Sequence, residues 1–135
     1  MTELEIQMRN IGIIPVVKID DAAKAVPLAK ALMAGGIKAA EVTFRTEAAV
    51  DAIAAIAKEC PDMLVGAGTV INVELAKKAI AAGSKFIVSP GFNPNVVDYC
   101  LSQNITIIPG VSSPSQIEAG LEKGLTTLKF FPAEQ

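Results

Sequence analysis

A lysine lies at the centre of a short β-branched and aromatic stretch close to the end of the 135-residue sequence. Alternation along a strand places Lys129 on one face with Thr127 and Phe131, and Leu128 and Phe130 on the other. An amine that is held among apolar groups, where charge is costly, can attack a carbonyl carbon. On this stretch alone, the simpler interpretation is an edge strand whose lysine points into water.

A second stretch combines charged and apolar residues in strict alternation. Glu41, Thr43 and Arg45 alternate with Val42 and Phe44, so a strand here has one polar face and one apolar face. A buried charge without a partner is costly, so this polar face is unexpected unless the charges pair or take part in chemistry. The pattern fits a structural ion pair between Glu41 and Arg45 as well as it fits a catalytic site.

Further polar residues follow the other apolar stretches. They are Lys18, Thr69, Ser89, Ser112 and Ser113. Each also has a structural interpretation: a lysine at a strand end is commonly solvated, and threonine or serine in a turn commonly binds the backbone. Together with Glu41, Arg45 and Lys129, however, they supply a carboxylate, a guanidinium and an amine. Those groups are the components of a Schiff-base site with an anchor for an anionic substrate.

The composition narrows the chemistry further. The sequence contains no histidine, which excludes Ser-His-Asp and Cys-His systems and most zinc sites. A net charge of −2 provides no basic surface, so we expect neither a nucleic-acid partner nor an anionic membrane surface. With 51% apolar residues and no signal-peptide pattern, we expect a cytoplasmic protein with one domain over residues 1–135. Cys60 and Cys100 are expected to be free, reduced thiols.

One theme recurs along the chain, an apolar strand followed by a polar turn and an alanine-rich helix. We expect strands at residues 13–19, 39–45, 63–70, 85–89, 105–109 and 126–131. The predicted helix caps are Asp20 or Asp21, Thr46, Asn72, Asn93 before Pro94, and Ser113 before Pro114 with Gln116 three residues later. The predicted helix ends are Gly35-Gly36, Cys60-Pro61, Gly83 and Gly124. This alternation predicts parallel strands joined by right-handed crossovers.

Parallel strands of this kind leave two α/β architectures open. One is a (β/α)8 barrel and the other is a doubly wound sheet; a solenoid is disfavoured because no consensus motif recurs. A doubly wound sheet commonly carries a glycine-rich loop, but after Gly66 and Gly68 the third glycine position is Ile71. A dinucleotide site is therefore weakly supported. In both architectures the functional residues lie at the carboxyl ends of the strands.

Four motifs occur in a characteristic order. They are Glu41-Val42-Thr43-Phe44-Arg45-Thr46, Gly66-Ala67-Gly68-Thr69-Val70, Ser89-Pro90-Gly91 and Lys129-Phe130-Phe131-Pro132-Ala133-Glu134. Over essentially the whole chain they closely resemble the 2-keto-3-deoxy-6-phosphogluconate (KDPG) / 4-hydroxy-2-oxoglutarate (KHG) aldolases, a class I aldolase family. The resemblance implies a TIM-barrel fold and a carbon–carbon lyase. Such a lyase cleaves KDPG to pyruvate and glyceraldehyde 3-phosphate, or KHG to pyruvate and glyoxylate.

The resemblance also implies a role for each site residue. Lys129 would form the imine with the C2 ketone, and Glu41 would be the general acid/base. The implied substrate contacts are Arg45 and Thr69 at the carboxylate, Pro90 and Phe131 as an apolar wall, and Lys18. The protonated imine is itself the electron sink, so we expect no metal and no cofactor. The expected partners are a small 2-keto acid and other copies of the chain, in a homotrimer.

The end of the sequence departs from the family pattern. It stops at Gln135, whereas a barrel of this type has eight strands and typically about 250 residues. We therefore expect about six βα units of a C-terminally truncated aldolase, without the loops after strands seven and eight that commonly bind phosphate. The chain alone would then be unstable or inactive unless another chain closed the barrel. Two alternatives remain: a fragment that acts only as an assembly module, and another phosphometabolite barrel enzyme, such as an isomerase with Glu41 as base.

Overall fold

Six parallel strands form one curved sheet in the computed structural model of the protein, which describes residues 1–134. The strands are β1 (Val16–Val17), β2 (Ala39–Thr43), β3 (Leu64–Gly68), β4 (Phe86–Ser89), β5 (Thr106–Val111) and β6 (Lys129–Phe130). Their order in the sheet is the order in the sequence, and each pairs in parallel with the next. A doubly wound sheet would reverse its strand order, so the observed order is that of a barrel.

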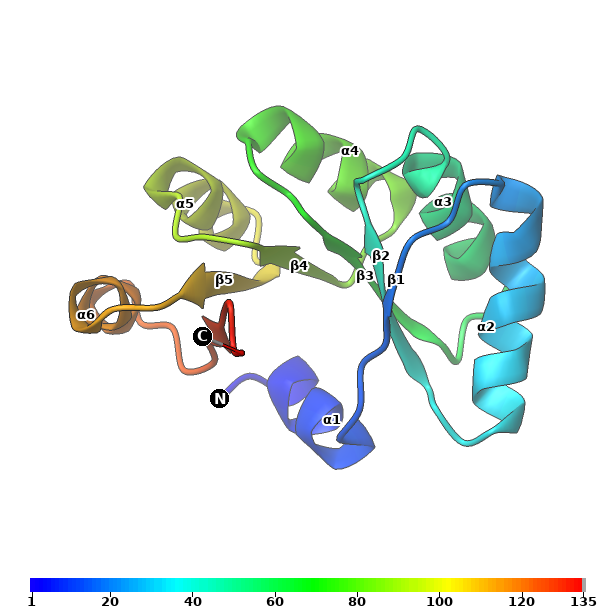
Figure 1. Cartoon of the computed structure of the whole chain (residues 1–135), viewed down its shortest axis with the longest axis horizontal. Helices are drawn as coiled ribbons and strands as arrows, with labels where there is room; N and C mark the ends of the chain where they lie inside the picture. The colour runs from blue at the N-terminus through cyan, green and yellow to red at the C-terminus, as the bar shows by residue number, and fades with distance from the viewer. Residues whose placement is uncertain (135) are drawn as a thin grey trace.

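The helices lie mainly on one side of this sheet. They are α1 (Glu3–Ile11), a 3-10 turn η1 (Ala22–Lys24), α2 (Ala25–Ala34), α3 (Ala49–Glu59), α4 (Val73–Ala82), α5 (Pro94–Ser102) and α6 (Pro114–Glu122). Figure 1 shows α2 to α6 following one another around the outside of the curved sheet, while α1 lies on its open side. This is a partial TIM barrel with six strands among the described residues, as the sequence predicts. No helix in residues 1–134 is long and apolar enough to cross a membrane.

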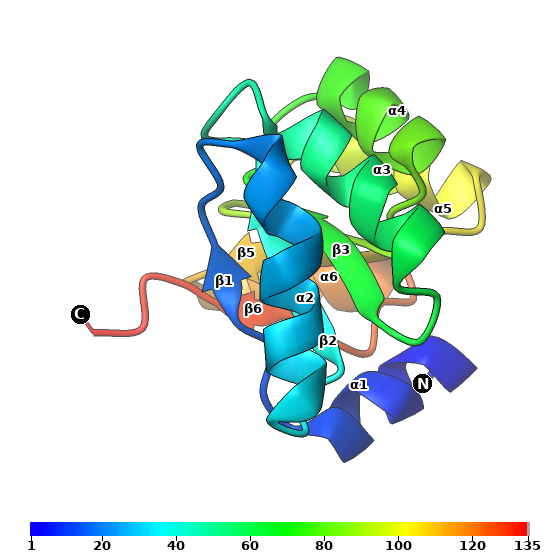
Figure 2. The same cartoon turned by 90° about the vertical axis from the view of Figure 1, so that its right-hand side faces the viewer.

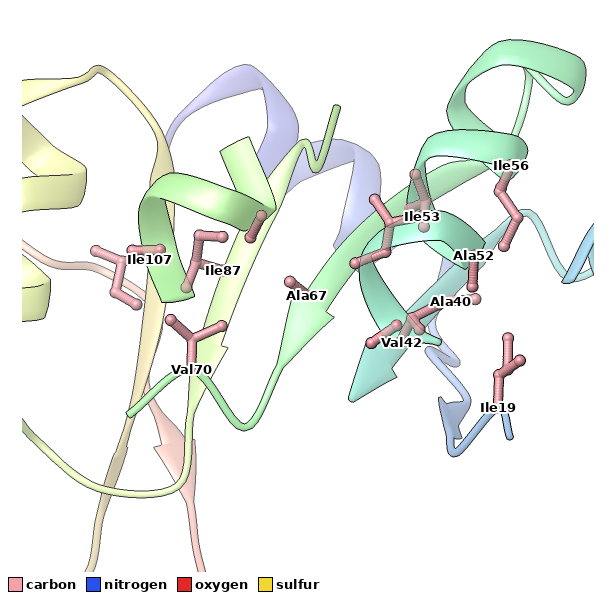
Figure 3. Close-up of a cluster of buried hydrophobic side chains, with 14 of the residues drawn as sticks. Ile19, Ala40, Val42, Ala52, Ile53, Ile56, Ala67, Val70, Ile87 and Ile107 are labelled. Carbon is pink, nitrogen blue, oxygen red and sulfur yellow. The ribbon is translucent and has the colours of Figure 1, made fainter. Parts of the chain in front are cut away.

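The outer core lies between the sheet and the helices α2 to α5. Figure 3 shows Val42 and Ala67 of the strands facing Ile53 and Ile56 of α3. These four side chains are at most 1% exposed. With so few aromatic residues, this layer is built from alanine, valine and isoleucine, which allow the helices to approach the sheet closely. The apolar face predicted for the second strand is therefore confirmed.

Helix caps explain most of the helix boundaries. Asn72 and Asn93 accept backbone hydrogen bonds at the starts of α4 and α5, and Ser113 does so for α6, as predicted. The prediction for Thr46 is wrong, because α3 begins only at Ala49 and the Thr46 hydroxyl donates to the carbonyl of Ile19 instead. Thr46 therefore joins two loops at the carboxyl ends of the first two strands.

Other boundaries differ from the expected ones in ways that local geometry explains. Asp21 caps η1 rather than α2, so the predicted first helix begins with a 3-10 turn. The Gln116 side chain accepts from the backbone of Ser112 rather than from the cap residue Ser113. The predicted strands at 13–19 and 126–131 shorten to the two-residue strands β1 and β6, because each of them pairs with only one neighbour over two residue positions.

The helix α1 was not predicted. Its signal in the sequence is a capping box, in which Thr2 caps the helix and Glu5, three residues later, accepts from the Thr2 backbone. Figure 2 shows α1 below the sheet, next to the lower end of α2. Met8 of α1 packs in an inner cluster with Phe86 and Ile108 of the sheet. Helix α1 therefore covers part of the inner face of the sheet.

Glu5 also joins α1 to the segment before β6. Its two carboxylate oxygens accept from the Thr126 hydroxyl at 3.0 and 3.1 Å. Burial raises the pKa of the Glu5 carboxyl, but hydrogen bonds from Thr2, Thr127 and Thr126 outweigh burial and hold it below its ordinary value. The carboxylate therefore stays charged and fixes the N-terminal helix against the segment that leads to Lys129.

Replacing Thr126 with valine is expected to lower the free energy of unfolding by about 1–3 kcal/mol, the cost of a lost hydrogen bond to a charged group. Thr126→Ser, which keeps the hydroxyl, is the matched control and should lose much less. Urea unfolding followed by circular dichroism measures both. Equal unfolding midpoints for the valine and serine variants would show that the Glu5–Thr126 contact contributes little.

The two cysteines are free, as predicted, and both are buried. Burial raises the pKa of the Cys100 thiol to about 11, so almost no thiolate is present at neutral pH. Cys60 and Cys100 both belong to the outer core and take no part in the site described next.

Candidate active site

The central feature of the site is an ion pair across the inner face of the sheet. Lys129 Nζ of β6 lies 3.9 Å from Glu41 Oε1 of β2. Three strands, β3 to β5, separate β2 from β6 in the sheet. In a flat sheet the two strands would be about 19 Å apart, at about 4.8 Å per strand. The two side chains meet because the sheet curls, which is the geometry of a barrel.

The two members of the pair differ in their environment. The Glu41 side chain is 7% exposed and that of Lys129 is 27% exposed. Burial raises the pKa of the Glu41 carboxyl above its ordinary value, and the positive charges of Lys129 and Arg45 offset this only in part. Glu41 therefore takes up a proton more readily than an ordinary glutamate, which suits a group that must carry protons. Lys129 Nζ also lies 4.8 Å from the centre of the Phe131 ring, a cation–π contact.

The raised pKa of Glu41 should make the free energy of unfolding depend on pH. The folded protein holds the proton on Glu41 more tightly than the unfolded chain does, so this group favours folding below its ordinary pKa of 4.5. That contribution is lost as pH rises through the folded-state pKa. We expect the free energy of unfolding of the unsubstituted protein, relative to Glu41→Gln, to fall between pH 4.5 and neutrality. Urea unfolding at several pH values measures the difference, in which the other carboxyls cancel. A flat or rising difference would contradict it.

Two glycines make room for this arrangement on the inner face of β3. A Cβ on Gly68 would lie 2.0 Å from Glu41 Oε1, and a Cβ on Gly66 would lie 2.3 Å from the Phe86 ring. These are the glycines considered above as part of a dinucleotide loop. The structure places both inside β3, which explains why they occur two residues apart, on one face of a strand. The sequence showed the spacing but not the carboxylate that fills the space.

Gly68→Ala tests the need for this space. A methyl group there would displace the Glu41 carboxylate, and misplacing a catalytic group by about 1 Å can cost about 100-fold in rate. We expect a loss of that size in pyruvate-dependent adduct formation, measured by borohydride trapping. Gly91→Ala is the control, because a Cβ at Gly91 meets nothing within 4 Å. A Gly68→Ala protein that reacts at the normal rate would show that Glu41 can occupy another position.

Arg45 lies two residues beyond the end of β2. Its Nε–H donates to Thr43 Oγ1 at 3.0 Å, and the Thr43 hydroxyl donates to the carbonyl of Val17 at 2.9 Å. Arg45 is exposed, whereas Thr43 is buried. Glu41 and Arg45 do not form the structural ion pair considered above. The Glu41 carboxylate pairs with Lys129, and the Arg45 guanidinium donates to Thr43.

The remaining predicted residues lie at the carboxyl ends of other strands. Thr69 directly follows β3 and has a positive φ of 58°. Pro90 directly follows β4, where the Ser89 hydroxyl donates to the Gly91 carbonyl, and Phe131 directly follows β6. A Cβ on Gly110 of β5 would lie 2.0 Å from the Pro90 carbonyl oxygen, so the loop after β4 packs closely on β5. These residues occupy the same end of the sheet as Arg45.

Lys18 also follows a strand directly, since β1 ends at Val17, but its side chain lies in solvent. Its Nζ lies 2.7 Å from Asp20 Oδ1, with side chains 51% and 72% exposed. The structure thus pairs Lys18 with an exposed carboxylate in solvent, and its role as a substrate contact stays a prediction. Within residues 1–134 no cluster of three histidine, cysteine, aspartate or glutamate side chains could hold a metal ion.

Comparison with known proteins identifies the family. Residues 4–135 match the family described as KDPG and KHG aldolase. The chain belongs to the KDPG and KHG aldolase family. Two of its relatives in this family are a 2-dehydro-3-deoxy-phosphogluconate aldolase of Treponema pallidum and the KHG/KDPG aldolase of Escherichia coli K12. The first is 55% identical over 127 residues, covering 94% of this chain and 60% of the relative. The second is 47% identical over 122 residues, covering 90% and 57%.

Solved structures of the aldolase family share the fold. The 2-keto-3-deoxy-6-phosphogluconate aldolase of Zymomonas mobilis ZM4, solved with 3-phosphoglycerate, has a TM-score of 0.91 and 42% identity, covering 98% of this chain and 63% of that one. The KDPG aldolase of Legionella pneumophila, with pyruvate captured as a covalent carbinolamine, has a TM-score of 0.86 and 43% identity, covering 90% and 59%. The chain spans about 60% of the length of the curated relatives it matches.

Proposed function

We propose that this chain carries the reacting groups of a class I aldolase. The substrate is KDPG, cleaved to pyruvate and glyceraldehyde 3-phosphate, or KHG, cleaved to pyruvate and glyoxylate. The observation that supports this proposal is the 3.9 Å pair of Lys129 and Glu41 on the inner face of a curved parallel sheet. A nucleophilic amine beside a carboxyl that takes up protons readily is what imine formation requires.

The first half of the reaction forms the imine. The Lys129 ammonium first gives a proton to Glu41. The lone pair freed on Nζ attacks the C2 carbonyl carbon, and a proton of Nζ moves to the carbonyl oxygen, which becomes the hydroxyl of a carbinolamine. Glu41 then gives a proton to this hydroxyl, which leaves as water while a protonated imine forms. Arg45 and Thr69 would bind the C1 carboxylate, the first through a guanidinium that is suited to carboxylates. Pro90 and Phe131 would flank the carbon chain.

The second half breaks the carbon–carbon bond. Glu41, now a carboxylate, removes the proton of the C4 hydroxyl, the C3–C4 bond breaks, and its electron pair moves into the protonated imine to give an enamine. The C4 fragment leaves as the aldehyde. Glu41 returns the proton to C3, and water hydrolyses the imine to release pyruvate and free Lys129. Every proton that is removed is returned, so the cycle needs no redox partner.

Borohydride trapping tests this function. The 135-residue chain is incubated with pyruvate and sodium borohydride, and the mass of the intact protein is measured. We expect one stable pyruvate adduct, which peptide mapping places on Lys129, and such an adduct would contradict the expectation that the chain alone is inactive. The absence of an adduct, or an adduct on a different lysine, would overturn the proposal. It would favour the alternative of an inactive assembly module.

We also propose a homotrimer and a cytoplasmic location. A homotrimer is what the family resemblance implies, and light scattering of the purified chain measures it directly. A cytoplasmic location fits a substrate class of small charged metabolites and the two free, buried thiols.

A further inference from the structure

Thr43 is the one buried polar residue of β2 apart from Glu41. It is 1% exposed, and its hydroxyl lies between the Arg45 guanidinium and the Val17 carbonyl of β1. The reaction described above does not use this hydroxyl. A buried hydroxyl that both donates and accepts a hydrogen bond can hold either of its partners in place.

The two hydrogen bonds have a fixed direction. A carbonyl oxygen can only accept and a guanidinium can only donate, so the proton of the Thr43 hydroxyl points to Val17 and its lone pairs face Arg45 Nε. Serine could keep both bonds, whereas valine, which has the same shape, could keep neither. Thr43 thus holds Arg45 by a chemical feature that can be removed without changing the volume of the residue.

Holding Nε determines which part of the guanidinium is available. Of its five N–H groups, the Nε–H is bound by Thr43, and the four on the two Nη atoms remain for a ligand. These form the end of the planar fork, which binds both oxygens of a carboxylate. Arg45 is otherwise an exposed and long side chain, so fixing it beforehand removes part of the entropy cost of binding.

We propose that Thr43 is a positioning residue that orients the terminal nitrogens of Arg45 toward the carboxylate of the 2-keto acid. This inference rests on the proposed function, because it assigns a role in binding the same substrate. The competing interpretation is that Thr43 only ties β2 to β1 through Val17. The two interpretations differ in whether the effect of Thr43 depends on the negative charge of the ligand.

The test compares two ketones with Thr43→Val. Borohydride trapping is measured at increasing concentrations of pyruvate and of methyl pyruvate, which has the same ketone but no carboxylate charge. We expect the half-saturating concentration of pyruvate to rise about tenfold, because binding must then immobilise the long Arg45 side chain, and that of methyl pyruvate to stay unchanged. Thr43→Ser should bind pyruvate like the unsubstituted chain.

A second variant shows whether Thr43 acts through Arg45. In an Arg45→Lys background there is no Nε–H for Thr43 to hold, so Thr43→Val should cause no further loss of pyruvate binding. Equal losses for pyruvate and methyl pyruvate, or a further tenfold loss in the Arg45→Lys background, would overturn the positioning role alone. The lack of any adduct in the unsubstituted chain would overturn the proposed function together with this inference.

Discussion

Replacing Lys129 with arginine is expected to abolish the pyruvate adduct completely. A guanidinium stays protonated at neutral pH and has no lone pair with which to attack a ketone. The substitution nevertheless keeps a positive charge next to Glu41, whose carboxylate lies 3.9 Å from the present amine. The fold should therefore persist, which circular dichroism verifies on the same sample. Mass spectrometry after borohydride treatment measures the loss.

The matched control is Lys30→Arg on the exposed surface of α2, which should give the same adduct as the unsubstituted chain. An adduct of unchanged yield in Lys129→Arg would place the imine elsewhere. The same variant separates the aldolase from an isomerase, since proton abstraction by Glu41 does not need an amine that can form an imine. An isomerase would keep its activity when Lys129 is arginine.

Glu41→Gln is expected to slow proton transfer by about 10²–10⁴-fold, the usual contribution of a general acid/base. The amide has nearly the same shape and fits in the space above Gly68, but it cannot carry a proton. A suitable measurement is deuterium exchange at the methyl group of pyruvate in heavy water, followed by proton NMR. This exchange requires imine formation and then removal of a proton from carbon.

Glu59→Gln at the end of α3 is exposed and serves as the control, with unchanged exchange expected. If Glu41→Gln exchanged the methyl protons within a few-fold of the normal rate, a different base would be responsible. Since imine formation also uses Glu41, trapping of pyruvate by this variant should be slower but should reach the same final adduct.

Much of the site could be predicted from the sequence because strand alternation is a local property. The polar face of Glu41 and Thr43 follows from their spacing alone, and the structure places both on the inner face. The caps Asn72, Asn93 and Ser113 are local in the same sense, because each bonds a backbone group within three residues. Where Thr46 was expected to act locally, a distant carbonyl competed for its hydroxyl.

What could not be predicted depends on contacts between residues far apart in the sequence. The space that Gly68 leaves is meaningful only because Glu41 of the neighbouring strand fills it. The role of Thr43 requires the carbonyl of Val17, which is 26 residues away in the sequence. The helix α1 had a readable capping box, but nothing local shows that Glu5 reaches Thr126.

The packing of Phe86 against Gly66, the residue of β3 that pairs with Glu41, has a consequence for the reacting pair. Phe86 is fully buried in the middle of the inner face, between the strands that carry Glu41 and Lys129. The separation of that pair is set by the accumulated bend of every strand between them. A larger or smaller side chain in place of Phe86 would change this bend, and with it the distance between the Lys129 amine and the Glu41 carboxyl. In this fold, the reactivity of the pair therefore depends in part on the curvature of the sheet.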